Sequence, residues 1–183
     1  MKKQLFTFSF FLFSLTVFSQ AGEGRIQTQL NGKIEDWQVT LGADEGDMEA
    51  YLMNDPNRWT FSVGSLEGEV NSEFNDQYNS WEITVAEKTY HLKTWLSASW
   101  SRWELSGGDL PEKVSIRTLY QNSWDNWQLT RDSVEVNITT YMNNSWNDWS
   151  IDGDIAKVTD GEKVAALFIP IFVSRIYRRN LVH

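Results

Sequence analysis

The chain has 183 residues, with 25 acidic and 16 basic side chains, a formal net charge of −9, ten tryptophans and no cysteine. Without cysteine, a disulfide scaffold and a thiolate metal site are excluded. An apolar content of 41% is too high for a disordered chain. The acidic balance argues against a nucleic-acid binder, because such proteins need a basic face to displace counterions.

Residues 1–21 have the layout of a cleaved signal peptide. Lys2 and Lys3 form a basic start, residues 5–18 are apolar apart from Thr and Ser, and Ser19-Gln20-Ala21 places small residues where a signal peptidase reads them. The apolar stretch is too short to span a bilayer. We therefore expect an exported protein, periplasmic or extracellular, whose mature chain begins near Gly22.

Residues 22–158 are built on a 22-residue repeat. Six tryptophans set its frame, with spacings of 22 residues except for one of 24, where a longer connection runs through residues 107–111. A fixed period of this length indicates an array of similar supersecondary units. We call these six the phase tryptophans: Trp37, Trp59, Trp81, Trp103, Trp127 and Trp149.

Apolar and polar residues alternate within each unit, which is the period of a β-strand. The segment from Trp81 to Val85 shows it, reading apolar, polar, apolar, polar, apolar. Apolar residues recur eleven and seven residues before the phase tryptophans and two after them, and we take this apolar ladder as the core face. The phase tryptophans belong to the same face, so we assign them to the core. The position seven before holds Leu30, Leu52, Phe74, Leu96, Tyr120 and Met142.

Each unit thus predicts two strands, and the repeats predict a mainly β fold. We expect an antiparallel meander of about twelve strands, one hairpin per unit, with one apolar face. The alternative is a β-solenoid with one 22-residue coil per repeat. Short turns and the absence of periodic glycine favour the meander. The sequence leaves open whether the sheet stays open or closes.

Residues 159–183 break the repeat. Thr159-Asp160-Gly161-Glu162 matches a capping box, and residues 164–176 are almost entirely apolar. We predict a helix, kinked or started late by Pro170, that packs on the apolar face and completes the same domain. A final β-strand is the alternative, because the run is rich in Phe, Ile and Val. The basic residues Arg175, Arg178 and Arg179 stand where a helix C-terminus favours positive charge.

The side chains that catalysis requires are sparse. Neither His91 nor His183 has a spaced partner for zinc or iron, and no nucleophile elbow or phosphate loop occurs. Carboxylates such as Glu82 and Glu104 fall on the predicted solvent face, where a glycosidase pair would not be desolvated. The acidic turns 44–47 and 152–154 do not match a calcium loop. We expect no catalytic residues, no metal and no cofactor.

The remaining aromatic residues are the candidate binding residues. Three tryptophans lie three residues before a phase tryptophan, in the second turn, and others project on the polar face. Aromatic rows stack on sugar rings or on a partner's apolar side chains, although turn aromatics also fold back over a core edge. The candidate residues are Trp95, Trp100, Trp124, Trp146, Tyr78 and Tyr141.

We expect a non-catalytic exported repeat protein with a structural or protein-interaction role. One alternative is a carbohydrate-binding module that uses the aromatic row, and another is a carrier of apolar ligands inside a curled sheet. An outer-membrane barrel fits less well, because its strands need about 9–11 residues with an apolar outward face, whereas the strands expected here have about five to eight. The partner would be a protein or a glycan, not nucleic acid, and the chain would not be membrane-integral.

Overall fold

The computed structural model describes residues 24–29, 34–52, 55–75, 77–96, 99–120, 123–142 and 145–178, so the predicted signal peptide, residues 1–21, lies outside the described residues. The elements are β1 (Gly24–Thr28), β2 (Asp36–Leu41), β3 (Asp44–Leu52), β4 (Asp55–Val63), β5 (Leu66–Phe74), β6 (Gln77–Val85), β7 (Lys88–Leu96), β8 (Ser99–Gly107), β9 (Val114–Thr118), β10 (Asn126–Arg131), β11 (Val134–Thr140), β12 (Asp148–Gly153), the 3-10 helix η1 (Ile155–Lys157) and α1 (Asp160–Arg178).

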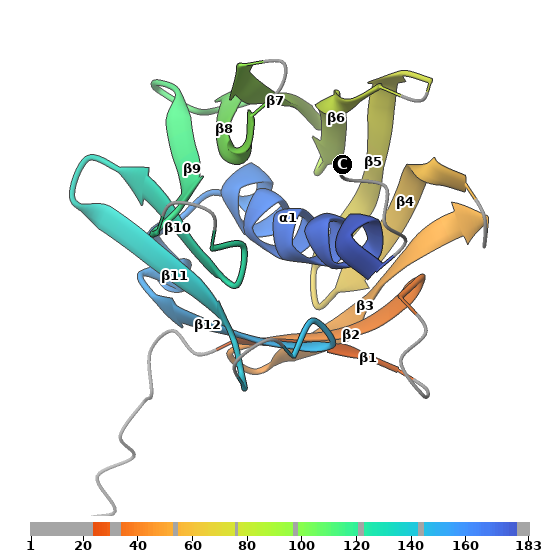
Figure 1. The fold of residues 1–183 in the computed structure, drawn as a ribbon. Helices are drawn as coiled ribbons and strands as arrows, with labels where there is room; N and C mark the ends of the chain where they lie inside the picture. The colour runs from red at the N-terminus through yellow and green to blue at the C-terminus, as the bar shows by residue number, and fades with distance from the viewer. Residues whose placement is uncertain are drawn as a thin grey trace, which may run out of the picture.

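The twelve strands form one antiparallel sheet that closes on itself. Each strand pairs with its neighbour in sequence, and β1 also pairs with β12, where Ile26 lies opposite Trp149. The meander is therefore a closed barrel (Figure 1). The predicted antiparallel meander is confirmed, and the β-solenoid alternative is wrong because consecutive strands run in opposite directions.

Glycines permit close approach of neighbouring strands in the first half of the barrel. A Cβ on Gly46 would lie 1.8 Å from the Ser62 carbonyl oxygen, and one on Gly68 would lie 1.9 Å from that of Thr84. No side chain fits there, and glycines at set strand positions let a sheet curl into a barrel. Gly24, Gly46 and Gly68 follow one another at spacings of 22 residues. The interpretation that glycine is not periodic is therefore wrong for these three units.

The six phase tryptophans are fully buried inside the barrel, together with the residues eleven before and two after them. Five donate the indole N–H to the backbone carbonyl three residues earlier, at 2.8–3.0 Å. Each such bond satisfies the ring's polar atom near the start of an even-numbered strand. The sixth, Trp149, donates instead to Ser174 Oγ of α1 at 3.1 Å. Five of the six units therefore share the same indole-to-carbonyl hydrogen bond.

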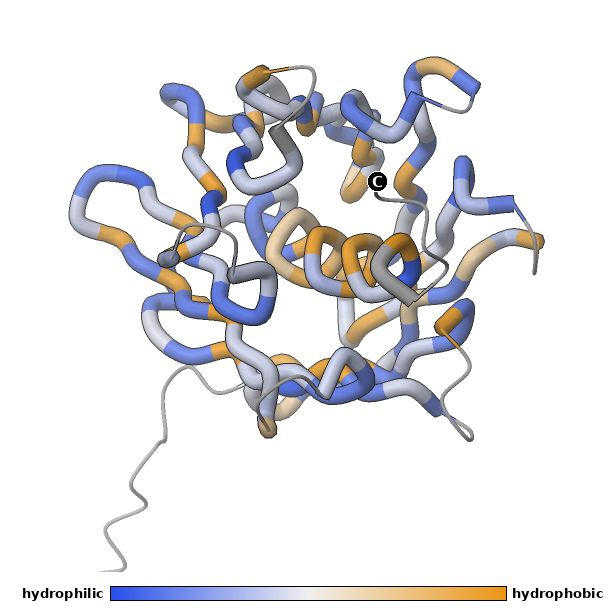
Figure 2. The backbone as a smooth tube through the Cα atoms, in the orientation of Figure 1, coloured by the Kyte–Doolittle hydropathy of each residue, from blue (hydrophilic) through white to orange (hydrophobic). Residues whose placement is uncertain are grey.

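Helix α1 occupies the interior of the barrel, with strands around it (Figures 1 and 2). Residues 164–173 are all buried, and the rings of Phe168 and Phe172 lie 4.8 and 4.7 Å from that of Trp81. The predicted helix is confirmed and the alternative of a final strand is wrong. Pro170 lies within the helix, which begins ten residues before it. None of the described helices is long and apolar enough to cross a membrane.

The two ends of the barrel differ. Odd-numbered strands all run in one direction, because neighbours are antiparallel. They begin at what we call the short-turn end, which holds two-residue turns such as Ala86-Glu87, both at positive φ as type I′ hairpins require. They finish at what we call the long-turn end, where three of the connections, 29–35, 119–125 and 141–147, have seven residues each. Since α1 follows β12, it enters at the short-turn end and runs toward the long-turn end.

Candidate functional site

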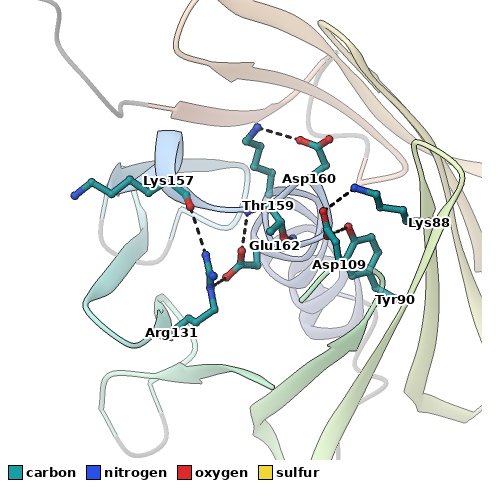
Figure 3. Close-up of polar contacts among 9 residues, drawn as sticks. Lys88, Tyr90, Asp109, Arg131, Lys157, Thr159, Asp160 and Glu162 are labelled. Atoms are coloured by element: carbon teal, nitrogen blue, oxygen red, sulfur yellow. Dashed lines mark hydrogen bonds and ion pairs between the residues drawn. The ribbon is translucent and has the colours of Figure 1, made fainter. Parts of the chain in front are cut away.

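A buried ion pair fixes the start of α1 at the short-turn end (Figure 3). The fully buried Glu162 carboxylate lies 2.9 Å from Arg131 Nε of β10. It also accepts the backbone N–H of Thr159 at 2.7 Å, and the Glu162 N–H donates to Thr159 Oγ1 at 3.4 Å. This is the predicted capping box, which satisfies two free N–H groups at the helix start. Its extra bond to Arg131 ties the helix to the barrel wall.

A second polar cluster lies beside the first turn of α1. Tyr90 donates its hydroxyl to Asp109 Oδ1 at 2.6 Å, and Lys88 Nζ lies 2.6 Å from the other carboxylate oxygen. A Cβ on Gly161 would come within 2.5 Å of the Tyr90 ring, so the helix rests directly on that ring. Burial and the bond to Asp109 raise the pKa of Tyr90 to about 12. The contacts of both clusters connect α1 with the barrel, which is an anchoring role.

Tyr90→Phe should change how stability depends on alkaline pH. The pKa of Tyr90 rises from 10.0 to about 12 in the folded protein. The folded state therefore retains a proton that the unfolded state loses, and the wild type should lose about 2–3 kcal/mol of unfolding free energy between pH 10 and 12 relative to the variant. Urea denaturation of both proteins from pH 8 to 11.5 measures this difference. Parallel pH profiles would contradict the assignment.

The long-turn end carries a different feature, which we call the exposed rim. Among the described residues, every exposed large apolar side chain belongs to it, with exposed fractions from 39% to 68%. They stand eight and seven residues before the phase tryptophans, at the ends of β3, β5, β7, β9 and β11 or just beyond. The exposed rim consists of Tyr51, Leu52, Phe74, Trp95, Leu96, Leu119, Tyr120, Tyr141 and Met142.

One prediction from the repeat is wrong at the exposed rim. The position seven before each phase tryptophan was assigned to the core, yet all five described members are exposed, and Leu30 lies outside the described residues. The register shifts just before Leu52, Phe74 and Leu96, where one residue of the odd-numbered strand lies opposite three of its even-numbered partner. A β-bulge interrupts the alternation of faces and re-aims the following side chain. The other two positions lie beyond the last residues of β9 and β11.

Three arginines stack on three aromatic rings of the rim. The guanidinium carbons of Arg58 and Arg102 lie 4.4 Å from the ring centroids of Tyr51 and Trp95. That of Arg25 lies 4.6 Å from Tyr141. Such cation–π contacts hold a ring in place, while the rings remain more than half exposed. They form fixed aromatic platforms that face solvent.

Carboxylates neutralise part of this positive charge. Arg58 Nη2 lies 2.8 Å from Glu69, and Arg25 makes two bonds to Asp148, at 2.9 and 2.7 Å. The hydrogen bond from Asp148 raises the pKa of Arg25. The arginines therefore act mainly through stacking, and the rim carries little net charge of its own.

One position of the rim is polar instead of aromatic. Glu73 takes the place of Tyr51 and Trp95 in the third unit, and its carboxylate lies 2.9 Å from His91 Nδ1 and 3.0 Å from Lys93 Nζ. Ser80 Oγ donates to it at 2.7 Å. Burial opposes ionisation, but these hydrogen bonds outweigh it and lower the pKa of Glu73. The cluster interrupts the apolar side chains of the rim.

The six candidate binding residues separate into two groups. Trp95 and Tyr141 belong to the exposed rim. The other four are partly buried: the rings of Tyr78 and Trp100 lie 5.8 and 5.7 Å from Phe172, while Trp124 and Trp146 pack on neighbouring phase tryptophans. All four pack against the buried core, and we call them the inner collar. They are the residues Tyr78, Trp100, Trp124 and Trp146.

Sequence reasoning missed most of the rim. Trp95 and Tyr141 were expected on the polar face, but the position seven before each phase tryptophan was assigned to the core, and the stacked arginines were not considered. A signal was present, because two consecutive apolar residues such as Trp95-Leu96 break the alternation that a half-buried strand requires. Arg58 and Arg102 also occupy one repeat position, directly before a phase tryptophan.

The described residues contain no group of three or more His, Asp or Glu side chains placed to hold a metal ion. No known protein family, curated protein or solved structure matches the chain. The function must therefore be argued from the geometry.

Proposed function

We propose that the protein is an exported, non-catalytic β-barrel module with a structural or protein-interaction role, and that the exposed rim is its contact surface. The observation that carries this proposal is the concentration of exposed large apolar side chains on one rim. Soluble monomers seldom expose contiguous apolar patches of more than a few hundred Å². The rim is also rich in Tyr, Trp, Met and Arg, the residues that are enriched in protein–protein contacts.

The interior of the barrel supports an interaction role over an apolar-ligand carrier. A carrier needs a cavity for its ligand. Here α1 fills the space that such a ligand would take, with Phe168 and Phe172 against the rings of the phase tryptophans.

The outward positions of the central strands carry polar side chains such as Glu82 and Thr84, whereas a membrane-spanning barrel places apolar residues there.

A capture experiment tests the proposal. The tagged protein, the rim variant Leu52→Ser/Leu96→Ser and a control with Glu67→Ser/Glu87→Ser at the short-turn end would each be incubated with the exported proteins of the producing cells. We expect wild type and control to retain the same protein, identified by mass spectrometry, and the rim variant to lose it. Identical capture by all three would show that the rim is not the contact surface.

One hollow favours carbohydrate binding as a second candidate. It has a volume of about 390 Å³ and includes the exposed ring of Tyr141, the Arg25 guanidinium, two hydroxyl side chains and the Asp152 carboxylate. An aromatic platform beside such polar groups suits a sugar ring. A glycan array would show binding that Tyr141→Ala abolishes and Trp124→Ala preserves. An array without signal would remove this candidate and leave the protein contact.

A further inference from the structure

We propose that the partner seated on the exposed rim is a second copy of this chain, so that two barrels associate rim to rim as a dimer. The inference rests on the proposed function and names its partner. It follows from the distribution of the rim around the barrel, from the area of the barrel end and from the position of the acidic side chains.

The apolar side chains form an arc around the barrel mouth. Five odd-numbered strands in succession, from β3 to β11, each contribute one or two exposed apolar residues. A small ligand would contact only one or two of these strands. A second rim of the same diameter can meet all of them, and a twofold axis then matches each arc with its copy. Such an isologous contact closes as a dimer and does not propagate into a filament.

The barrel end has the area that a stable dimer needs. Twelve strands about 4.8 Å apart and tilted by about 40° give a circumference of about 75 Å. A circle of this circumference has a radius of about 12 Å. Widened by about 4–5 Å for the outward side chains, the end of the barrel has a cross-section of about 800–900 Å². A protein–protein interface of standard size buries about 800 Å² on each partner. The barrel end is therefore wide enough for an interface of this size, and the exposed rim occupies most of its circumference.

Charge disfavours contact between two short-turn ends. Acidic side chains outnumber basic ones at the turns of the short-turn end, and the whole chain has a net charge of −9. Rim-to-rim association places the two acidic ends as far apart as the dimer allows, whereas end-to-end contact of the short turns would bring them together. The acidic residues concerned are Asp44, Glu45, Glu67, Glu87, Asp109, Glu112, Asp132, Asp152 and Asp154.

A lipid interface would also accept aromatic and aliphatic side chains. Two rim arginines are already paired with carboxylates, Arg58 with Glu69 and Arg25 with Asp148, so little positive charge remains to attract anionic headgroups. Binding of a second copy does not depend on free positive charge, because the arginines of both rims are already paired with carboxylates of their own chain. We therefore argue for the dimer and treat the membrane surface as an outcome of the test.

Sedimentation equilibrium of the purified exported protein from 1 to 200 μM tests the dimer. The rim variant is Leu52→Glu/Leu96→Glu, at two side chains that are more than half exposed. The matched control is Ser65→Glu/Ser133→Glu, which adds the same charge in two exposed turns of the short-turn end. We expect wild type and control to approach twice the monomer mass, and the rim variant to dissociate at least tenfold more readily. Circular dichroism melts verify that all three are folded.

Each other result overturns the proposal in a distinguishable way. A wild type that stays monomeric throughout removes the dimer, and if it then binds phosphatidylcholine–phosphatidylglycerol vesicles through the rim, the surface belongs to a membrane. A monomeric wild type that captures another exported protein through the rim keeps the proposed function and loses only the second copy. A rim variant that dimerises like wild type and captures the same proteins removes both proposals.

Discussion

Truncation after Val158, which removes α1, should abolish the folded barrel. The helix buries apolar side chains over nearly its whole length, including Leu167, Phe168, Ile169 and Phe172. Burial of a large apolar side chain stabilises a protein by about 1.5–3 kcal/mol, so these four alone reach the range of the total stability of a typical domain, about 5–15 kcal/mol. We expect loss of the cooperative thermal transition, binding of a hydrophobic dye and oligomerisation.

Truncation after Arg178 is the matched control, because it removes five residues and leaves α1 whole. This shorter chain should melt like the full chain. A synthetic peptide of residues 159–178 added to the long truncation would test whether the helix acts by filling the interior. If the chain without α1 kept the oligomeric state and the melting temperature of the full chain, the empty barrel would support itself.

Trp81→Ala should cost about 3–5 kcal/mol of unfolding free energy, the usual range for an emptied aromatic site in a core. Its ring is fully buried and lies within 5 Å of Phe168 and Phe172, and its N–H bonds the Tyr78 carbonyl. Truncation therefore opens a cavity between helix and wall and leaves that carbonyl without its donor. Urea denaturation measures the loss.

Alanine substitutions at two other tryptophans should cost less unfolding free energy than Trp81→Ala. Trp124 of the inner collar is partly buried, so Trp124→Ala should cost about 1–2 kcal/mol. Trp95 is more than half exposed, so Trp95→Ala should stay within about 1 kcal/mol despite the loss of its stack with Arg102. A larger loss at Trp124 than at Trp81 would mean that the collar, and not the phase tryptophans, holds the helix.

Local patterns in the sequence determined the repeat, the strands and the start of the helix. Alternation of apolar and polar residues depends only on the geometry of an extended chain, so two strands per unit were predicted correctly. Their length was underestimated, because β3 to β8 have nine residues each and not about five to eight. The capping box likewise depends on residues three apart, and Thr159 and Glu162 form it as expected. The burial of the phase tryptophans follows from their parity, because every unit repeats the same face.

Closure was decided by contacts between distant parts of the chain. The pairing of β1 with β12 joins residues such as Ile26 and Trp149, and no local pattern specifies that the first and last strands meet. Once the sheet closes, its apolar face becomes an interior, so the helix is surrounded instead of lying on an open surface. For the same reason Arg175, expected at a basic helix end, is buried with its guanidinium 5.2 Å from the Trp59 ring.

The exposed rim also depends on the tertiary structure. Leu52, Phe74 and Leu96 have the parity of the core, and the bulges that turn them outward appear only when each strand is paired with its neighbour. The stacking of Arg25 on Tyr141 joins residues more than a hundred positions apart, across the seam of the barrel. The sequence by itself therefore determined the repeating unit and its buried tryptophans. Closure and strand register decided which of the remaining aromatic residues pack against the core and which are exposed.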